Sequence, residues 1–478
     1  MNLTSATFFL FLAATILLFH VSKSVPYRRF VLGTANLVFI ASYLTNFTEA
    51  LPLLAFLLLG YLCVCLVHQQ RSGAALALSL AAVLVAYIFL KRFSFFEPLG
   101  RLPFSYLLIG LSYVLFRILH VIVDIRSGDL VERMSPLAFF RYTCNFLCFV
   151  SGPIQRYQEF SAMDGIEQQP VDATRVYEAF SRIATGYVKF VIVAATAEYA
   201  FSYLNQQLLV SNSGVAKLCL IYATAASLYT VFLYFNFSGY MDIVIGAGRL
   251  LGQSLPENFD KPFLARSFLE FWQRWHMTLS QWFKFYLFNP LLMVLMSWFP
   301  APGLTAFLGV VAFFITFLVM GVWHGTTAVF VVYGLLMGAG ASINKLWQIF
   351  CTARLGKKRY RVLSENTAYI YFARGLTVAY FVIALTCLWT PEPPQLIALV
   401  GRLGFAGMAG AFIIVALLFA LAALALDTIS TGIAGWASFA TLQRGVVVGN
   451  LALAGKMMAV IAVVSLLHKA PDFVYKAF

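Results

Sequence analysis

The sequence predicts an all-α integral membrane protein with many spans. Of its 478 residues, 61% are hydrophobic and only 11% are charged, and its mean hydropathy is +0.84. Soluble domains contain about 45–50% apolar residues. Apolar stretches of about 20 residues, long enough to cross a bilayer core, recur along nearly the whole chain with short polar breaks between them. We therefore expect one polytopic membrane domain over residues 1–478 and no separate soluble domain.

About 11–13 helices are expected to cross or enter the membrane, because that many apolar runs approach the length of a span. Each run ends at a cluster of charged or polar residues, or at glycine or proline. The candidate spans are residues 5–21, 31–46, 50–68, 73–90, 103–123, 136–153, 183–204, 215–235, 303–323, 325–350, 368–390, 407–428 and 446–467.

The N-terminal span is expected to remain in the protein. The first ten residues contain no Lys or Arg, no small-residue cleavage site follows, and the apolar run ends at Lys23, Arg28 and Arg29, which is unlike a cleaved signal. The positive-inside rule then places the N-terminus outside the cytoplasm and the loop 22–30 inside it. We expect a multi-pass protein of the cytoplasmic (inner) membrane.

The chain carries 33 basic and 19 acidic residues, a net charge of +14. Much of the excess lies in short loops such as 354–361, which suits positive-inside topology and contact with anionic lipid headgroups. A nucleic acid partner is not implied. The seven cysteines do not cluster with histidines at zinc-binding spacings, so we expect no metal site and no disulfide scaffold.

Residues 236–298 differ from the rest of the chain. Charged and amide side chains alternate there with Phe, Tyr and Trp too densely for simple lipid-facing helices. Such sequence suits interfacial or re-entrant segments beside a water-accessible cavity. A loop is expected over 256–262 and a helix from about Ser267, on which Trp272 and His276 would be neighbours four residues apart.

Two histidines lie in strongly apolar sequence, His276 and His324. An ionisable side chain within membrane sequence is costly and tends to face a cavity or a bundle interior, so both are candidates for chemistry. A structural histidine that only packs between helices is the alternative for each. The other histidines lie near predicted span ends without a motif, and we expect them at the interface: His20, His68, His120 and His468.

Three motifs carry a resemblance to a known family. They are Pro-Glu-Asn-Phe-Asp-Lys-Pro-Phe (256–263), Phe-Trp-Gln-Arg-Trp-His-Met-Thr-Leu-Ser-Gln-Trp-Phe (271–283) and Gly-Val-Trp-His-Gly (321–325), supported by Phe-Val-Ser-Gly-Pro-Ile-Gln-Arg-Tyr (149–157) and Phe-Ser-Gly-Tyr-Met-Asp (237–242). The chain resembles the membrane-bound O-acyltransferases (MBOAT), in the branch with alginate O-acetyltransferase and the D-alanyl transfer protein of teichoic acid synthesis. The motifs cover roughly residues 105–390 in order.

The resemblance implies that His324 is the catalytic histidine and His276 the second catalytic position, near one tunnel. It also implies a ring of tilted helices with re-entrant segments around a funnel-shaped centre. An acyl donor, acetyl-CoA or an acyl carrier protein thioester, would arrive from the cytoplasm as a co-substrate, with no tightly bound cofactor. A hydroxyl acceptor would arrive from the other side.

The sequence departs from the family pattern at two places. Asn236 stands where relatives commonly have Asp, and Lys284-Phe285-Tyr286 stands where they commonly carry Arg-Asp-Tyr or similar. Losing two carboxylates puts any family role for them in doubt in this chain, and the histidine chemistry is unaffected.

Six further residues are weaker candidates for substrate or donor contact. Trp323 abuts His324, whereas Trp272 and Trp275 suit packing or an interface belt as well as substrate contact. Arg274 and Arg266 suit phosphates of the donor, since guanidinium binds phosphate bidentately, but snorkelling toward headgroups fits equally. Asp242 is expected to pair with a cation such as Arg249 or to line the cavity.

The leading hypothesis is an O-acyltransferase that moves a short acyl group, acetyl first, onto an extracytoplasmic polysaccharide or cell-envelope polymer. D-alanyl transfer to teichoic acid is the enzymatic alternative. A transporter or flippase that uses the histidines as proton relays is the alternative of another class. The resemblance further implies a periplasmic or extracellular helper acyltransferase and a cytoplasmic carrier protein as partners.

Overall fold

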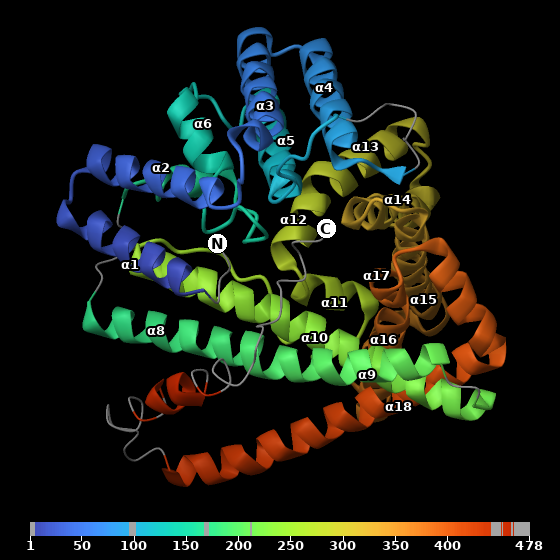
Figure 1. The fold of residues 1–478 in the computed structure, drawn as a ribbon. Coiled ribbons are helices and arrows are strands. Elements are labelled where there is room, and N and C mark those ends of the chain that lie inside the picture. Colours follow the sequence, from blue (N-terminus) through green and yellow to red (C-terminus); the bar gives the residue numbers. More distant parts are fainter. Residues whose placement is uncertain are drawn as a thin grey trace. The chain divides into compact units, whose positions relative to one another are not determined.

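A computed structural model describes residues 5–94, 102–166, 172–210 and 213–440, together with 451, 453–459 and 462. These residues form helices joined by loops, and they contain no β-strand beyond an isolated bridge (Figure 1). Eight helices of this part are long and apolar enough to cross a membrane. The predicted class, an all-α multi-pass membrane protein, is confirmed.

The eight long helical stretches match predicted spans, although several extend beyond them. They are Phe47–Gln70, Gly73–Lys91, Ala173–Val210, Val215–Leu250, Thr305–His324, Ala328–Glu365, Thr367–Trp389 and Pro393–Ile429. The predicted spans 5–21, 31–46 and 103–123 correspond to shorter helices of 16 or 17 residues. Most of the segment expected at 446–467, like His468, lies outside the described residues.

The described chain divides into two compact units. Unit 1 takes the residues up to 188 and 237–257. Its helices are α1 (Ala6–Val21), α2 (Val25–Ala41), α3 (Leu51–Gln70), α4 (Gly73–Lys91), α5 (Leu111–Ser127), α6 (Pro136–Thr143), α7 (Tyr157–Ser161) and α8 (Ala173–Tyr187), with a 3₁₀ turn at Phe47–Ala50. The last part of α10 (Val215–Leu250) also belongs to this unit.

The expected span at 136–153 is wrong as a continuous helix. Helix α6 ends at Thr143, and the chain then runs irregularly until α7 begins at Tyr157. The side chain of Arg117 explains how this backbone stays buried, because its guanidinium donates to the carbonyl oxygens of Thr143 (2.7 Å) and Cys148 (2.6 Å). A buried non-helical backbone needs such partners for its carbonyls.

Unit 2 takes residues 189–236 and those from 258 on. A π-helical stretch, Val188–Ala194, leads into it. Its helices are α9 (Ala195–Val210), the first part of α10, α11 (Phe268–Arg274), α12 (Met277–Phe283), α13 (Asn289–Trp298), α14 (Thr305–His324), α15 (Ala328–Glu365), α16 (Thr367–Ala384), α17 (Thr386–Trp389) and α18 (Pro393–Ala440), with 3₁₀ turns at Pro262–Leu264 and Pro302–Leu304 and a π-helical stretch at Lys284–Phe288.

Helices α14 and α15 lie side by side (Figure 1), and glycines set their distance. A Cβ atom on Gly321 would lie 2.1 Å from the Cα of Gly334, and one on Gly338 would lie 2.8 Å from the carbonyl oxygen of Phe314. Only hydrogen fits at these places, so the two backbones are in direct contact. This contact holds the C-terminal end of α14, where His324 is its last residue.

Candidate functional site

The chain turns sharply at His276 instead of continuing as one helix. Helix α11 begins after its N-cap, Ser267, as predicted, but it ends at Arg274. His276 has a left-handed backbone (φ 45°, ψ 53°), and α12 begins at Met277. The expectation that Trp272 and His276 are neighbours on one helix face is therefore wrong. Left-handed backbone is costly for a residue other than glycine and is found preferentially at functional sites.

The loop at 256–262 is paired with this turn. Phe259 and Trp275 form an antiparallel bridge, and the amide of Met277 donates to the carbonyl oxygen of Asn258 (2.9 Å). The amide of Asp260 donates to the carbonyl oxygen of Arg274 (2.9 Å). The first two family-like motifs of the sequence thus fold against each other, and the first supports the second.

Asn258 fixes the orientation of the imidazole of His276. Its Oδ1 accepts the backbone amide (3.0 Å) and the hydroxyl (3.0 Å) of Thr278, and it lies 3.3 Å from Nδ1 of His276. A backbone amide can only donate, so this side-chain atom must be the oxygen. Nδ1 of His276 must then carry the proton, and Nε2 is the basic nitrogen of the neutral ring.

Burial keeps the ring of His276 neutral. The side chain is fully buried, and loss of hydration lowers its pKa well below the usual value near 6.5. A positive charge on His324 lowers the pKa further. The two histidines, 48 residues apart in sequence, are therefore close enough in unit 2 to interact electrostatically, as the family resemblance implied.

His324 is buried at the end of α14, with 3% of its surface exposed. Its ring meets the ring of Trp323 edge-on at 4.8 Å between centroids and that of Tyr333 at 5.7 Å. The next residue must be glycine, because a Cβ on Gly325 would lie 2.0 Å from Cε2 of Phe330. The aromatic side chains of α15 thus pack against the turn that ends α14.

A cavity of about 510 Å³ lies in unit 2, lined by chain neighbours of both histidines and not by the histidines themselves. It is lined by Trp272, by Met277, which follows His276, and by Met320, which lies one helical turn before His324. Lys284 and Lys345 supply positive charge to its lining. We call it the Trp272 cavity. The indole nitrogen of Trp272 is buried and has no hydrogen-bond partner among the described residues.

Trp275 is a packing residue. Only 2% of its surface is exposed, and its ring stacks on Phe271 at 5.6 Å and meets Phe381 at 5.1 Å and Phe259 at 5.1 Å. Trp272 also packs against aromatic rings, those of Phe268, Phe271, Phe317 and Phe381, but unlike Trp275 it borders the cavity.

The two candidate arginines have different surroundings. Arg274 forms ion pairs with Glu270 (2.9 Å) and Asp260 (3.5 Å), so its charge is already compensated by the protein. Arg266 is exposed and lines a second pocket of the same unit. Lys284 and Lys345 are the cations that line the Trp272 cavity.

Asp242 belongs to unit 1 and is paired with a cation, as expected, but this cation is Arg182 and not Arg249. Nε of Arg182 lies 3.0 Å from Asp242, and its two terminal nitrogens each lie 2.5 Å from an oxygen of Glu257. Arg249 instead lies 3.9 Å from Glu178. Arg249 is on the same helix as Asp242 but seven residues further along, and it does not reach this carboxylate. Arg182 is on α8 and reaches across to Asp242 on α10.

Sequence reasoning missed several polar residues. Neither Asn258 nor Lys345 was predicted as a site residue, although Asn258 lies in the family-like motif at 256–263. His120 was expected at the interface and is wrong in that respect: it is fully buried in unit 1, where its Nε2 accepts the amide of Tyr157 (3.0 Å). The position of Asn258 within the motif at 256–263 was the only signal for it.

The fold and the site define a multi-pass helical membrane protein with two interacting buried histidines and a cavity lined by their chain neighbours. Residues 37–382 match the model of MBOAT, the membrane-bound O-acyltransferase family. The chain belongs to this family.

Relatives of two named activities resemble the chain over half of its length. It is 34% identical over 243 residues to a teichoic acid D-alanyltransferase of Streptococcus thermophilus (50% of this chain, 57% of that protein). It is 30% identical over 241 residues to a probable alginate O-acetylase, AlgI, of Pseudomonas fluorescens (50% and 44%). A teichoic acid D-alanyltransferase of Lacticaseibacillus rhamnosus is 26% identical over 316 residues (63% and 73%). The chain thus spans about half the length of the first two relatives.

Proposed function

We propose that this protein is an O-acyltransferase that moves a short acyl group, acetyl, from a cytoplasmic thioester to hydroxyl groups of an extracytoplasmic polysaccharide or other cell-envelope polymer. The observation that carries the proposal is the interaction of two buried histidines in a chain of the MBOAT family. A cavity lined by Met277 and Met320, near these histidines in the chain, supports it. Acyl transfer between such partners needs a base near pH 7 and exclusion of water.

His324 is the base in this proposal. It takes the proton of the acceptor hydroxyl while the oxygen attacks the carbonyl carbon of the thioester. The new C–O bond forms, the C–S bond breaks, and the leaving thiolate takes up a proton and departs as a thiol. A positioned base of this kind contributes roughly 10²–10⁴ to the rate.

His276 positions a reactant. A buried imidazole at this position suits one of two roles, donor positioning or stabilisation of the oxyanion. With Nδ1 bound to Asn258, the neutral ring presents an unprotonated Nε2, which accepts hydrogen bonds and does not donate them. This tautomer fits positioning of an N–H or O–H group of a reactant. An oxyanion role would require a proton on Nε2.

The Trp272 cavity is the place that we propose for the donor. A coenzyme A or carrier-bound thioester carries phosphate groups, and Lys284 and Lys345 line this cavity. Ammonium groups bind phosphate as point charges. Arg274 is already paired with carboxylates, so we propose the two lysines in its place. No tightly bound cofactor or metal is part of the proposal.

D-alanyl transfer to teichoic acid is the second candidate. The 34% identity to a teichoic acid D-alanyltransferase favours it, whereas the 30% identity to an alginate O-acetylase favours acetyl. In either case we propose a location in the cytoplasmic (inner) membrane with the N-terminus outside, a cytoplasmic carrier or coenzyme A thioester, and an extracytoplasmic helper acyltransferase. Family membership speaks against a transporter.

The test measures polymer-linked esters in cells that carry wild type, His324→Ala, His68→Ala or no copy of the protein. His68 lies at the end of α3, where its Nε2 contacts the carbonyl oxygen of Val131, so its substitution is the matched control. We expect esters with wild type and His68→Ala only, at equal protein levels. The mass of the released acid identifies acetate or alanine. If esters persist with His324→Ala, His324 is not the base of the transfer. If labelled substrate crosses the membrane and no ester forms, the protein is a transporter.

A further inference from the structure

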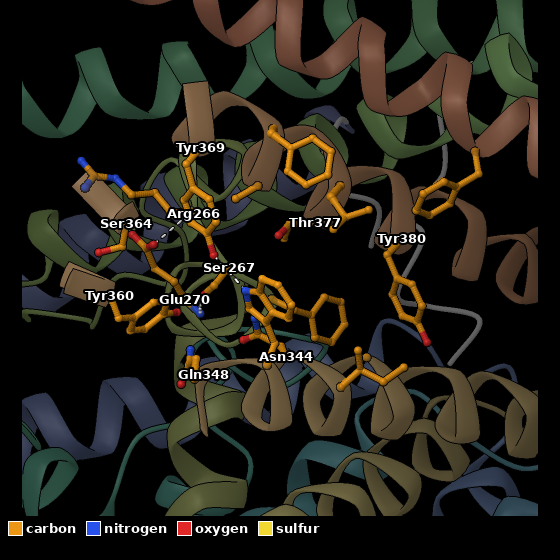
Figure 2. Close-up of a pocket in the computed structure, with 18 residues that line it drawn as sticks. Arg266, Ser267, Glu270, Asn344, Gln348, Tyr360, Ser364, Tyr369, Thr377 and Tyr380 are labelled. Carbon is orange, nitrogen blue, oxygen red and sulfur yellow. Dashed lines mark hydrogen bonds between the residues drawn. The ribbon is translucent and has the colours of Figure 1, made fainter. Parts of the chain in front are cut away.

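A second pocket of unit 2 lies between α11, α15, α16 and α18, and the acyl-transfer mechanism makes no use of it. Its volume is about 600 Å³. We call it the Tyr369 pocket. Figure 2 shows Arg266, Ser364 and Tyr360 at one end of it and Tyr380 at the other. From Tyr369 to Tyr380, α16 contributes lining residues over twelve positions, a rise of about 16 Å along the helix axis. The pocket is therefore a slot along a membrane helix.

The backbone of α15 builds the polar end of this slot. The helix is kinked at Gly356, whose φ of 79° is left-handed, and the residues after the kink turn back toward α16. Tyr360 and Ser364, one helical turn apart, line the pocket from this second part. Trp347 lines it from the first part and donates its indole N–H to the hydroxyl of Tyr369 (3.0 Å).

Away from the polar end the lining of the slot is mainly apolar, and its middle part faces the region of lipid chains. Phe372 and Ile343, which line the pocket, are 67% and 62% exposed on two membrane-spanning helices. At the closed end, a Cβ on Gly340 would lie 2.5 Å from Cε1 of Tyr380. Glycine at this position thus leaves room for the tyrosine ring, whose hydroxyl donates to the carbonyl oxygen of Leu336 (2.6 Å).

The polar end carries net positive charge. Glu270 lies there, but it accepts hydrogen bonds from Arg274 (3.1 Å) and from the amide of Arg266 (2.8 Å). Asp427, within electrostatic reach of Arg266, is paired with Arg374 (2.7 Å). Both carboxylates are therefore compensated. Arg361, in the segment after the kink, is paired with Glu365 (3.0 Å). The side chain of Arg266 remains, together with three exposed cations that follow the kink: Lys357, Lys358 and Arg359.

The segment after the kink has the character of an interfacial helix. Its cations are exposed, and so is the apolar side chain of Val362 (70%); Leu355, directly before the kink, is exposed as well (41%). Basic amphipathic helices of this kind lie at the boundary of headgroups and acyl chains. The polar end of the Tyr369 pocket is then at headgroup level, and its apolar end is at the depth of the hydrocarbon.

We propose that the Tyr369 pocket binds an anionic phospholipid from the surrounding membrane. One acyl chain lies along α16 between Phe372 and Tyr380, and the phosphate is near Arg266 and the cations after the kink. Three properties carry the assignment: an opening on membrane-spanning surface, a slot with one polar and one apolar end, and positive charge at the polar end. The proposal is independent of acyl transfer.

Photo-crosslinking of the full chain in vesicles tests this site. Two phosphatidyl probes carry the same diazirine-bearing acyl chain, one with a glycerol headgroup (anionic) and one with choline (zwitterionic), and labelled peptides are identified by mass spectrometry. We expect labels on α15 and α16 residues of the pocket. The anionic probe should label them roughly fivefold more, the effect of about one cation at an anionic membrane surface.

Two variants with matched controls test separately where the acyl chain of the lipid binds and where its headgroup binds. Ala373 lines the pocket, so Ala373→Phe should reduce labelling by both probes several-fold, whereas Ala422→Phe, on the exposed face of α18, should not. Arg266→Gln should remove the preference for the anionic probe, and Lys217→Gln, an exposed cation elsewhere, should keep it. Each variant is compared only after it elutes as a single species and melts like wild type.

Three results would overturn the site. Ala373→Phe with wild-type labelling means that no acyl chain occupies the slot. Labels spread evenly over α3 and α4, which lie outside the pocket, and over α15 and α16 indicate ordinary lipid contact. Loss of the anionic preference in excess inorganic phosphate, with labelling unaffected by Ala373→Phe, indicates a free-anion site instead of a lipid site.

Discussion

Nδ1 of His276 lies 3.3 Å from Oδ1 of Asn258, the same oxygen that accepts the amide and hydroxyl of Thr278. This relationship joins two loops 18 residues apart and selects one tautomer of the imidazole. In that tautomer Nε2 is the basic nitrogen. The buried asparagine is thus a positioning residue for the histidine, and it acts on chemistry only through the ring.

Replacing Asn258 tests this role. Asn258→Leu removes the acceptor, lets the ring reorient, and should lower kcat of the proposed transfer roughly 10²-fold, as loss of precise placement does. Asn258→Asp keeps an acceptor and should recover part of the rate. Its carboxylate favours the charged imidazolium and raises the pKa of His276, so the acid limb of the pH–rate profile should move to higher pH. The measurement is kcat and KM from about pH 5 to 8.

Thr278→Val serves as the comparison for Asn258. It removes the hydrogen bond from the hydroxyl to Oδ1 of Asn258 and leaves the amide bond and the histidine contact in place. We expect a smaller loss of kcat than with Asn258→Leu. If Asn258→Leu retained wild-type kcat, or if Asn258→Asp left the acid limb unmoved, Asn258 would be a structural residue only.

The stability of the protein should depend on pH through His276. Its pKa is near 6.5 in the unfolded chain and well below that in the fold. Between these two values only the unfolded chain binds the proton, so stability is complete above about pH 6.5 and falls as the pH is lowered toward the folded pKa. Each pKa unit between the unfolded and folded values of His276 corresponds to about 1.4 kcal/mol in the free energy of unfolding.

His276→Gln removes the proton-binding group and should flatten this dependence. We expect the Tm of wild type in detergent to fall more than that of His276→Gln between about pH 7.5 and 5. Contributions of other groups, including His120, are common to both proteins and cancel in the difference. Parallel Tm curves over this range would show that His276 does not remain neutral in the fold.

Gly325 should be needed for steric reasons alone. Its backbone is extended (φ −162°), which any residue adopts, but a Cβ would lie 2.0 Å from the ring of Phe330. We expect Gly325→Ala to lower stability by about 1–3 kcal/mol, the usual cost of overpacking, and to displace His324 with loss of transfer. Thermal unfolding and ester formation measure the two effects.

A double variant separates this clash from other causes. Phe330→Leu removes the ring atoms that meet the added methyl, so the double variant with Gly325→Ala should be more stable than the sum of the single effects predicts. Gly309→Ala is the control, since nothing lies within 4 Å of its Cβ position on the same helix. It should be neutral or slightly stabilising because alanine favours helix. Additive costs would disprove the clash.

The helical membrane fold could be predicted from the sequence because long apolar runs have few other ways to satisfy their backbone. The failure at 136–153 has a physical reason. Arg117 of another helix satisfies carbonyl groups of that stretch, and hydropathy does not register a partner distant in sequence. Span lengths failed likewise where a helix continues past its apolar run, as in α15. Residues 354–361, expected as a loop, are exposed for the most part and are helical on both sides of the kink at Gly356.

The histidines could be predicted as a pair through motifs, but their local geometry could not. A helix from Ser267 was predicted correctly at its start, where the N-cap is a local signal. Its end depends on pairing of residues 258–260 with the turn at His276, a contact that periodicity does not encode. The same limit applies to Asp242, because its true partner, Arg182, lies 60 residues away.

Asp242 should stabilise the fold and take no part in transfer. Its carboxylate and Arg182 are both largely buried, with 14% and 16% of their side chains exposed, whereas Glu257, the second partner of Arg182, is 53% exposed. Asp242→Asn should lower the free energy of unfolding by about 1.5–3 kcal/mol, the value of a hydrogen bond to a charged group. Glu257→Gln should cost less, under about 1 kcal/mol, as for exposed pairs. Ester formation per folded molecule should equal wild type in both variants. If the Asp242→Asn protein melts like wild type but forms no ester, the carboxylate of Asp242 takes part in the transfer reaction and is not only a structural group.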